Sequence, residues 1–271
     1  MARRKLQHGK CRLCGNVGDL SFEHVPPQKA FNNRRTITLS WEQMLRLGPD
    51  EPVKGKVDQG GVGMFSLCPS CNNNTGDWYA RALVKWCYRG MEILERGGRD
   101  AAVLHVQRCH PLRVFKQILT MFCSVNPEMA DKQPWLRKLL LDRSARDWEE
   151  SWRLFLYFNI EGKLRYTGAS GSIDLGTGAM TVLTEINYPP FGYVLVMSGP
   201  PPDVRLTDIT SLIRYGYEET AELVMPISVL ATHSKYPGDY RTRDQILRDR
   251  ETGLAADAEM RAATDPSGDG S

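Results

Sequence analysis

Two closely spaced pairs of cysteines carry the clearest chemistry in the sequence. Cys11 and Cys14 form one Cys-x-x-Cys pair, Cys68 and Cys71 form another, and 53 residues separate the two pairs. A two-residue spacer lets one tight turn present both thiolates to a single ion, and four thiolates make a closed tetrahedral zinc site. The sequence therefore predicts a structural Zn²⁺ bound by all four cysteines.

The pairs could instead be free thiols or redox pairs, but neither follows the strand-to-helix pattern of a thioredoxin motif. The remaining cysteines lie singly within apolar patterns that indicate helices, and they are Cys87, Cys109 and Cys123. A free cysteine packs as a small hydrophobic residue. We therefore expect these three thiols in the core.

A second motif lies between and after the cysteine pairs. The segment Glu23-His24-Val25-Pro26-Pro27 stands between them, and the second pair continues into Asn72. Both segments, in this order, resemble the HNH endonuclease superfamily, and the resemblance covers Cys11 to Arg96. In that family an Asp/Glu-His-Ile/Val-x-Pro segment ends a strand, and a Cys-x-x-Cys-His/Asn segment opens the helix that follows. The resemblance implies a zinc-stabilised ββα-metal domain.

The resemblance also implies roles for three residues. His24 is the expected general base, because imidazole, with a pKa of about 6.5, can deprotonate water near neutral pH. Glu23 and Asn72 would offer oxygen ligands to a catalytic Mg²⁺ or Mn²⁺. Neighbouring residues of a strand point to opposite faces, so Glu23 and His24 can both serve only at a strand end. The two prolines that follow favour such an end.

Each role has an alternative. Asn72, Asn73 or Asn74 could simply cap the helix that carries Trp78, because asparagine is a favoured N-cap. His24 could be a structural histidine. The family's middle asparagine, which steadies the histidine loop, is missing from residues 60–66, and Asn32 or Asn33 of the insertion could replace it. The other histidines show no ligand spacing, and they are His8, His105, His110 and His233.

The surrounding elements predict an α+β fold. Bulky residues from Trp78 to Leu94 recur at helical spacing, and two more helices are expected at 111–123 and 128–141. Pro134 should mark a break in the last of these or its true start. From Trp152 the pattern changes to strands: 153–160, a hairpin of 172–175 with 180–183, and 193–197. A strand is also expected at 223–225.

These patterns divide the chain into four parts. Residues 1–100 are expected to form the HNH-type nuclease domain, and 101–148 a helical connector. Residues 149–240 should form a β-rich antiparallel accessory or sensor domain without a catalytic motif. Residues 241–271 have the composition of a charged helix followed by a disordered tail.

Charge and hydropathy narrow the expected partners. Residues 1–110 hold 17 Lys and Arg against 10 Asp and Glu, whereas 111–271 hold 18 against 22. A basic front half suits nucleic acid, and DNA is the expected substrate. No apolar stretch is long enough to span a bilayer and no secretory signal is evident, so a cytoplasmic protein is expected.

Two function classes remain open from the sequence. The first is a metal-dependent endonuclease, such as a bacterial or phage defence or mobile-element effector. The second is a non-catalytic zinc module that binds nucleic acid. Glu23 favours the enzyme, and the missing middle asparagine favours the binding module. The C-terminal half would serve a homo-oligomer or a regulatory partner.

Overall fold

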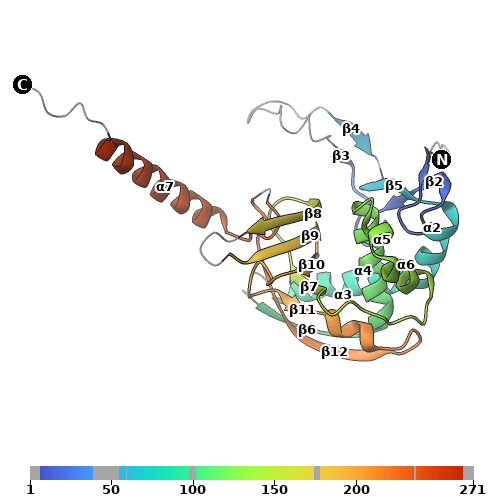
Figure 1. The fold of residues 1–271 in the computed structure, drawn as a ribbon. Coiled ribbons are helices and arrows are strands. Elements are labelled where there is room, and N and C mark those ends of the chain that lie inside the picture. The colour runs from blue at the N-terminus through green and yellow to red at the C-terminus, as the bar shows by residue number, and fades with distance from the viewer. Residues whose placement is uncertain are drawn as a thin grey trace, which may run out of the picture.

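The front of the chain folds around a small antiparallel sheet that is followed by a long helical segment. The computed structural model describes residues 7–38, 55–58, 60–97, 102–173, 178–234 and 236–264. The sheet has the order β1-β2-β5, with strands Gln7–Lys10, Val17–His24 and Gly63–Leu67. Strands β3 (Thr36–Thr38) and β4 (Lys56–Asp58) form a separate ribbon. This ribbon projects from the body beside β5 (Figure 1).

The helical segment after β5 begins at the second cysteine pair. Helix α2 (Pro69–Thr75) passes through a π-helical turn (Gly76–Ala80) into α3 (Arg81–Gly97). Pro69 occupies the first turn, where its missing N–H has no helical partner to lose. Gly90 lets α3 approach the large sheet, because a Cβ there would lie 2.4 Å from the Phe191 ring. The π-helical turn and α3 together confirm the helix expected from Trp78 to Leu94.

The strand β6 (Ala102–Cys109) overturns one expectation. It pairs antiparallel with β12 (Ala221–Ser228), where a helical connector had been expected from residue 101. Cys109 consequently lies in a strand and not in a helix. The buried face of β6 carries His105 and Gln107, whereas Leu104 is 60% exposed. Because polar residues occupy the buried face and Leu104 is exposed, the hydrophobic pattern of the sequence does not indicate a strand here.

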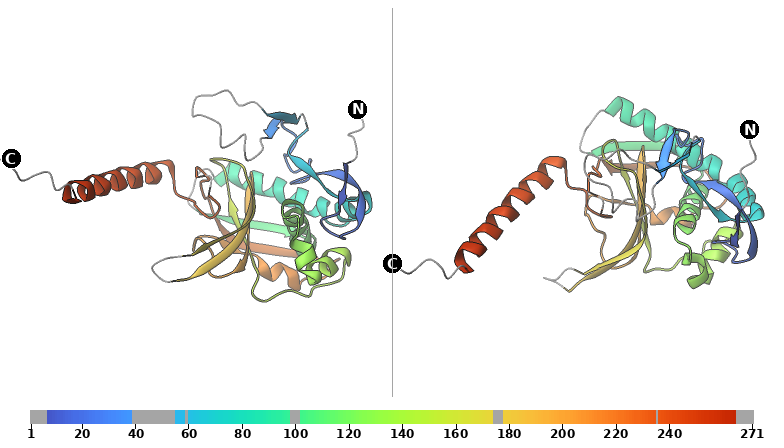
Figure 2. Two further views of the ribbon diagram at one scale, coloured as in Figure 1. Left: turned by 45° about the horizontal axis from the view of Figure 1, so that its top comes forward. Right: turned by 90° about the horizontal axis from the view of Figure 1, so that it is seen from above.

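Helix α4 (Pro111–Val125) runs through the middle of the molecule. Every residue from Pro111 to Ser124 is buried except Arg113, so the helix has no solvent face. It packs against α3, β5, β8 and β9, and it joins the cysteine turns and the large sheet into one core. The views in Figure 2 show it between the front sheet and the large sheet.

The region expected as one helix at 128–141 is two helices. Helix α5 (Met129–Lys132) ends before Pro134, and Pro134 is the first residue of α6 (Pro134–Leu141). Proline therefore marks the start of the second helix, as one of the two alternatives predicted.

The second half contains the predicted antiparallel sheet. Its strands follow the order β11-β7-β10-β9-β8, and their bounds are Thr207–Asp208, Arg153–Phe158, Phe191–Ser198, Met180–Tyr188 and Arg165–Ile173. All four pairings are antiparallel. The hairpin predicted between 172–175 and 180–183 is confirmed in its described residues, and 174–177 lie outside them. The mixed helices and antiparallel sheets make the chain an α+β protein.

The chain closes with helix α7 (Arg243–Thr264), which extends away from the body (Figure 1). Its described side chains, up to Leu254, are almost all exposed. The helix predicted in the charged tail is thus confirmed, and the tail expected after it lies outside the described residues. Within the described part of the chain, no helix combines the length and apolar composition needed to cross a membrane.

Candidate metal centre and active-site pocket

The two cysteine pairs converge at one point. Cys11 and Cys14 lie in the turn between β1 and β2, and Cys68 and Cys71 lie at the start of α2. Their four sulfur atoms all lie within 4.8 Å of one another. Sulfurs bound to one Zn²⁺ at about 2.3 Å would be about 3.8 Å apart, and Cys14 Sγ and Cys68 Sγ are 3.9 Å apart. The cluster could hold a metal ion such as zinc.

The protonation of the thiols fits a site for a cation. A hydrogen bond with Cys71 lowers the pKa of Cys11, and the same contact raises the pKa of Cys71. Burial raises the pKa of Cys14. These three thiols therefore cannot all ionise unless a cation compensates their charge. The described residues contain no second group of three or more His, Cys, Asp or Glu at metal-binding distance.

The other cysteines are core residues, as predicted. Cys87, Cys109 and Cys123 are buried, and burial raises the pKa of Cys87 and Cys109 to about 12. They remain protonated thiols at neutral pH.

A small cavity next to this cluster brings the three motif residues together. It has a volume of about 230 Å³, and its lining comes from β2, the following loop, α2, the π-helical turn and α4. The residues that line it are Phe22, Glu23, His24, Pro27, Gln28, Asn72, Gly76, Ala80 and Gln117. Glu23, His24 and Asn72 therefore share one site.

His24 is the last residue of β2, at the strand end that the sequence predicted. It shares a strand face with Phe22, and the two rings lie edge to face with centroids 5.1 Å apart. Phe22 in turn packs edge to face on Phe65 at 5.4 Å. The aromatic contacts fix the imidazole at the edge of the cavity.

Asn72 lies inside α2 and does not cap it. The N-cap residue is Cys68, and Asn72, Asn73 and Asn74 all follow within the helix, so the capping alternative is wrong. The Asn72 side-chain amide donates to Ser21 Oγ at 2.9 Å. Because Nδ2 faces β2, Oδ1 is the atom of Asn72 that remains for a ligand.

Glu23 is buried where it lines the cavity, and its carboxylate is held by two hydroxyl groups. Its Oε2 accepts hydrogen bonds from Ser66 Oγ at 3.2 Å and from Ser124 Oγ. Burial raises the pKa of Glu23 to about 7, while the two serines and Arg12 oppose that rise. No motif in the sequence indicates that Ser66 and Ser124 contact Glu23.

Asn32 steadies the loop that follows His24. Its side chain is fully buried, and Nδ2 donates to the carbonyl oxygens of Pro26 and Val62, both at 2.7 Å. Oδ1 accepts from the backbone N–H of Val62 at 2.7 Å. Gly61 makes room for this contact with a φ of +101°, since a Cβ there would lie 1.9 Å from the Asn32 carbonyl oxygen. Asn33 is exposed, and no such contact from it is seen among the described residues.

Replacing Asn32 by alanine should therefore destabilise the protein. The loss of the three hydrogen bonds made by this buried side chain leaves backbone groups unpaired, and we expect a cost of roughly 2–4 kcal/mol in the free energy of unfolding. Urea unfolding of the zinc-loaded protein measures it. Asn33→Ala is the matched control and should change stability by less than about 0.5 kcal/mol. Equal stabilities for the two variants would contradict the role assigned to Asn32.

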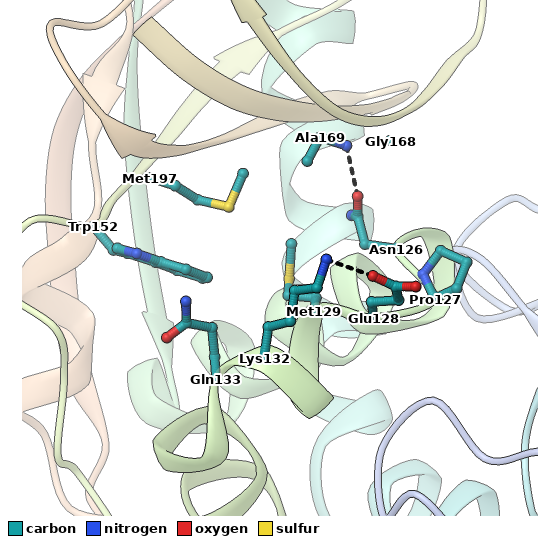
Figure 3. Close-up of a pocket in the computed structure, with 10 residues that line it drawn as sticks. All are labelled: Asn126, Pro127, Glu128, Met129, Lys132, Gln133, Trp152, Gly168, Ala169 and Met197. Atoms are coloured by element: carbon teal, nitrogen blue, oxygen red, sulfur yellow. Dashed lines mark hydrogen bonds and ion pairs between the residues drawn. The ribbon is translucent and has the colours of Figure 1, made fainter.

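A larger cavity lies between the α4–α5 junction and the large sheet (Figure 3). Its volume is about 470 Å³, and Met129, Trp152 and Met197 form apolar walls. Its polar groups are engaged: Asn126 Oδ1 accepts from Ala169 N at 2.7 Å, and Lys132 pairs with Glu128 at 2.6 Å. This cavity suits an apolar ligand better than acid–base chemistry.

The second half also holds a buried ion pair, which serves the fold. Arg165 and Glu185 lie 3.0 Å apart, and both side chains are almost fully buried. Tyr157 donates to Glu185 Oε1 at 2.5 Å, and Gly238 N donates to Oε2 at 3.0 Å. The pair fixes the segment before α7 to the sheet.

No family model matches this chain, and neither does any of the curated proteins or solved structures compared with it. Its function therefore has to be inferred from the geometry of the pocket and the cysteine cluster.

Proposed function

We propose that the protein is a metal-dependent endonuclease of the HNH type that hydrolyses phosphodiester bonds in DNA. The observation that supports this most is the shared cavity of Glu23, His24 and Asn72. The cavity lies on an antiparallel strand pair and the helix after it, beside a cluster of four cysteines. This is the arrangement expected from the HNH resemblance.

In this proposal His24 removes a proton from the attacking water. Phe22 holds the ring in place, so little reorientation is needed before the proton transfer. Asn32 keeps the loop after His24 in position through its contacts to Pro26 and Val62.

Glu23 and Asn72 would hold the divalent ion. A carboxylate and an amide carbonyl are the oxygen ligands that Mg²⁺ and Mn²⁺ prefer, and the two side chains line one cavity. When bound, the ion would stabilise negative charge on the phosphate and on the leaving oxygen. Because the pKa of Glu23 is raised to about 7, its carboxyl group is partly protonated at neutral pH. A bound cation would favour the ionised form of this group.

Two observations favour the enzyme over a non-catalytic zinc module. A buried carboxylate at the pocket gives no advantage to a protein that only binds phosphates. Asn32 also supplies the loop contact whose apparent absence had favoured the binding module.

The loop next to the pocket carries exposed basic side chains that can contact the phosphates of DNA, and these are Lys29, Arg34 and Arg35. A cytoplasmic location and a partner for residues 149–240 stay predictions.

Cleavage of supercoiled plasmid by the zinc-loaded full-length protein tests the proposal. We expect nicked or linear product when Mg²⁺ or Mn²⁺ is added, and none when the added metal is omitted. If no DNA or RNA is cut with magnesium, manganese or nickel, the enzyme proposal fails. Tight binding to the same plasmid would then identify a non-catalytic module.

A further inference from the structure

Gln117 brings an unexplained polar atom to the pocket. It lies in α4, outside the strand–helix motif, and its residue is only 3% exposed. Its Oε1 is buried and has no hydrogen-bond partner among the described residues. Gln117 nevertheless lines the same cavity as Glu23, His24 and Asn72.

The other polar side chains that point from α4 into the protein are paired. Lys116 Nζ donates to the carbonyl oxygens of Asp142 and Arg143, at 2.7 and 3.0 Å. Thr120 donates to the Lys116 carbonyl at 2.9 Å, and Ser124 donates to Glu23. Buried acceptors in native proteins almost always have a partner, so the partner of Gln117 Oε1 should be a group that enters the cavity.

We propose that Gln117 Oε1 is a third protein ligand of the divalent ion, beside Glu23 and Asn72. The inference rests on the proposed function, because it concerns the same ion. A neutral amide oxygen suits Mg²⁺ and Mn²⁺, and it adds a ligand without adding charge. With Glu23 as the one anionic ligand, the ion keeps net positive charge for a phosphate. Helix α4 thereby contributes both a ligand and, through Ser124, the anchor of Glu23.

Manganese binding to the zinc-loaded full-length protein tests this without any nuclease assay. The electron paramagnetic resonance signal of unbound Mn²⁺ gives the affinity of the parent, Asn72→Ala and Gln117→Leu. We expect Gln117→Leu to weaken Mn²⁺ binding at least about tenfold. Without Mn²⁺ its thermal midpoint should equal or exceed that of the parent, because an unpaired buried acceptor has been removed. If this variant does not fold, Gln117→Met replaces it with the same readout.

Gln107→Leu is the matched control. Gln107 is also buried with an unpartnered Oε1, but it lies on β6 and lines a different cavity. Its replacement should leave Mn²⁺ affinity unchanged. If Gln107→Leu weakens binding as much as Gln117→Leu, the effect is not specific to the pocket and the inference fails.

The remaining outcomes separate the inference from the proposed function. If Asn72→Ala weakens Mn²⁺ binding and Gln117→Leu does not, Gln117 is no ligand, while the nuclease proposal stands. If Gln117→Leu weakens binding and the parent cuts no nucleic acid, the ligand assignment stands and the nuclease proposal fails. A parent that binds no Mn²⁺ overturns both.

Discussion

Replacing His24 by alanine should abolish metal-dependent DNA cleavage. A general base that is lost costs about 10²–10⁴ in rate, and the described pocket offers no second imidazole to replace it. Single-turnover cleavage of plasmid DNA by the zinc-loaded variant measures the loss. Its zinc content and unfolding midpoint should stay close to those of the parent, because His24 is not one of the clustered cysteines and is only half-buried.

His8→Ala is the control for this experiment. His8 is an exposed histidine on β1, 3.7 Å from Asp19, and it does not line the pocket. Its replacement should leave the cleavage rate unchanged. If His24→Ala cuts as fast as the parent, His24 is not the base and the catalytic assignment of the pocket is wrong.

The second large effect is expected at the cysteine cluster. The protein should purify with about one zinc ion per chain, and Cys71→Ser should lose that ion. Apparent zinc affinities correspond to about 10–16 kcal/mol in small domains, so the loss should unfold the front sheet and α2. Elemental analysis for zinc and thermal unfolding measure the two effects, and chelation of the zinc should reproduce them in the parent.

Cys123→Ala separates the loss of a ligand from the loss of a buried thiol. Cys123 is fully buried in α4 but does not belong to the cluster, so its replacement should cost about 1 kcal/mol and leave the zinc content unchanged. A parent that contains no zinc, or a Cys71→Ser variant with unchanged zinc and stability, would contradict the metal assignment.

Local spacing explains what could be predicted from the sequence. The sequence predicts the Cys-x-x-Cys turns, the strand ending at His24 and the hydrophobic strands of the large sheet. Each of these features is formed by residues that lie close together in the sequence. Each was therefore visible as a motif or a period. Cys11 and Cys68 are 57 positions apart. Their proximity could be predicted only because a structural zinc site needs four protein ligands.

What was missed depends on contacts between distant segments. Ser124 bonds Glu23 across 101 positions, and nothing near Ser124 indicates that role. Strand β6 lies where the sequence predicts a helical connector, because His105 and Gln107 on its buried face interrupt the hydrophobic pattern of a strand. The sequence offers both Asn32 and Asn33 as replacements for the middle asparagine, and only the burial of Asn32 and its contacts to Val62 distinguish the two.

Helix α4 has a consequence for any attempt to transfer the pocket into another protein. A fragment that ends at Gly97 would retain Glu23, His24, Asn72 and all four clustered cysteines. It would nevertheless lack Ser124 beside the Glu23 carboxylate and would expose Leu83 and Trp86, which are fully buried in the whole chain. All residues of the motif lie before Gly97, but the site that they form also depends on residues of α4.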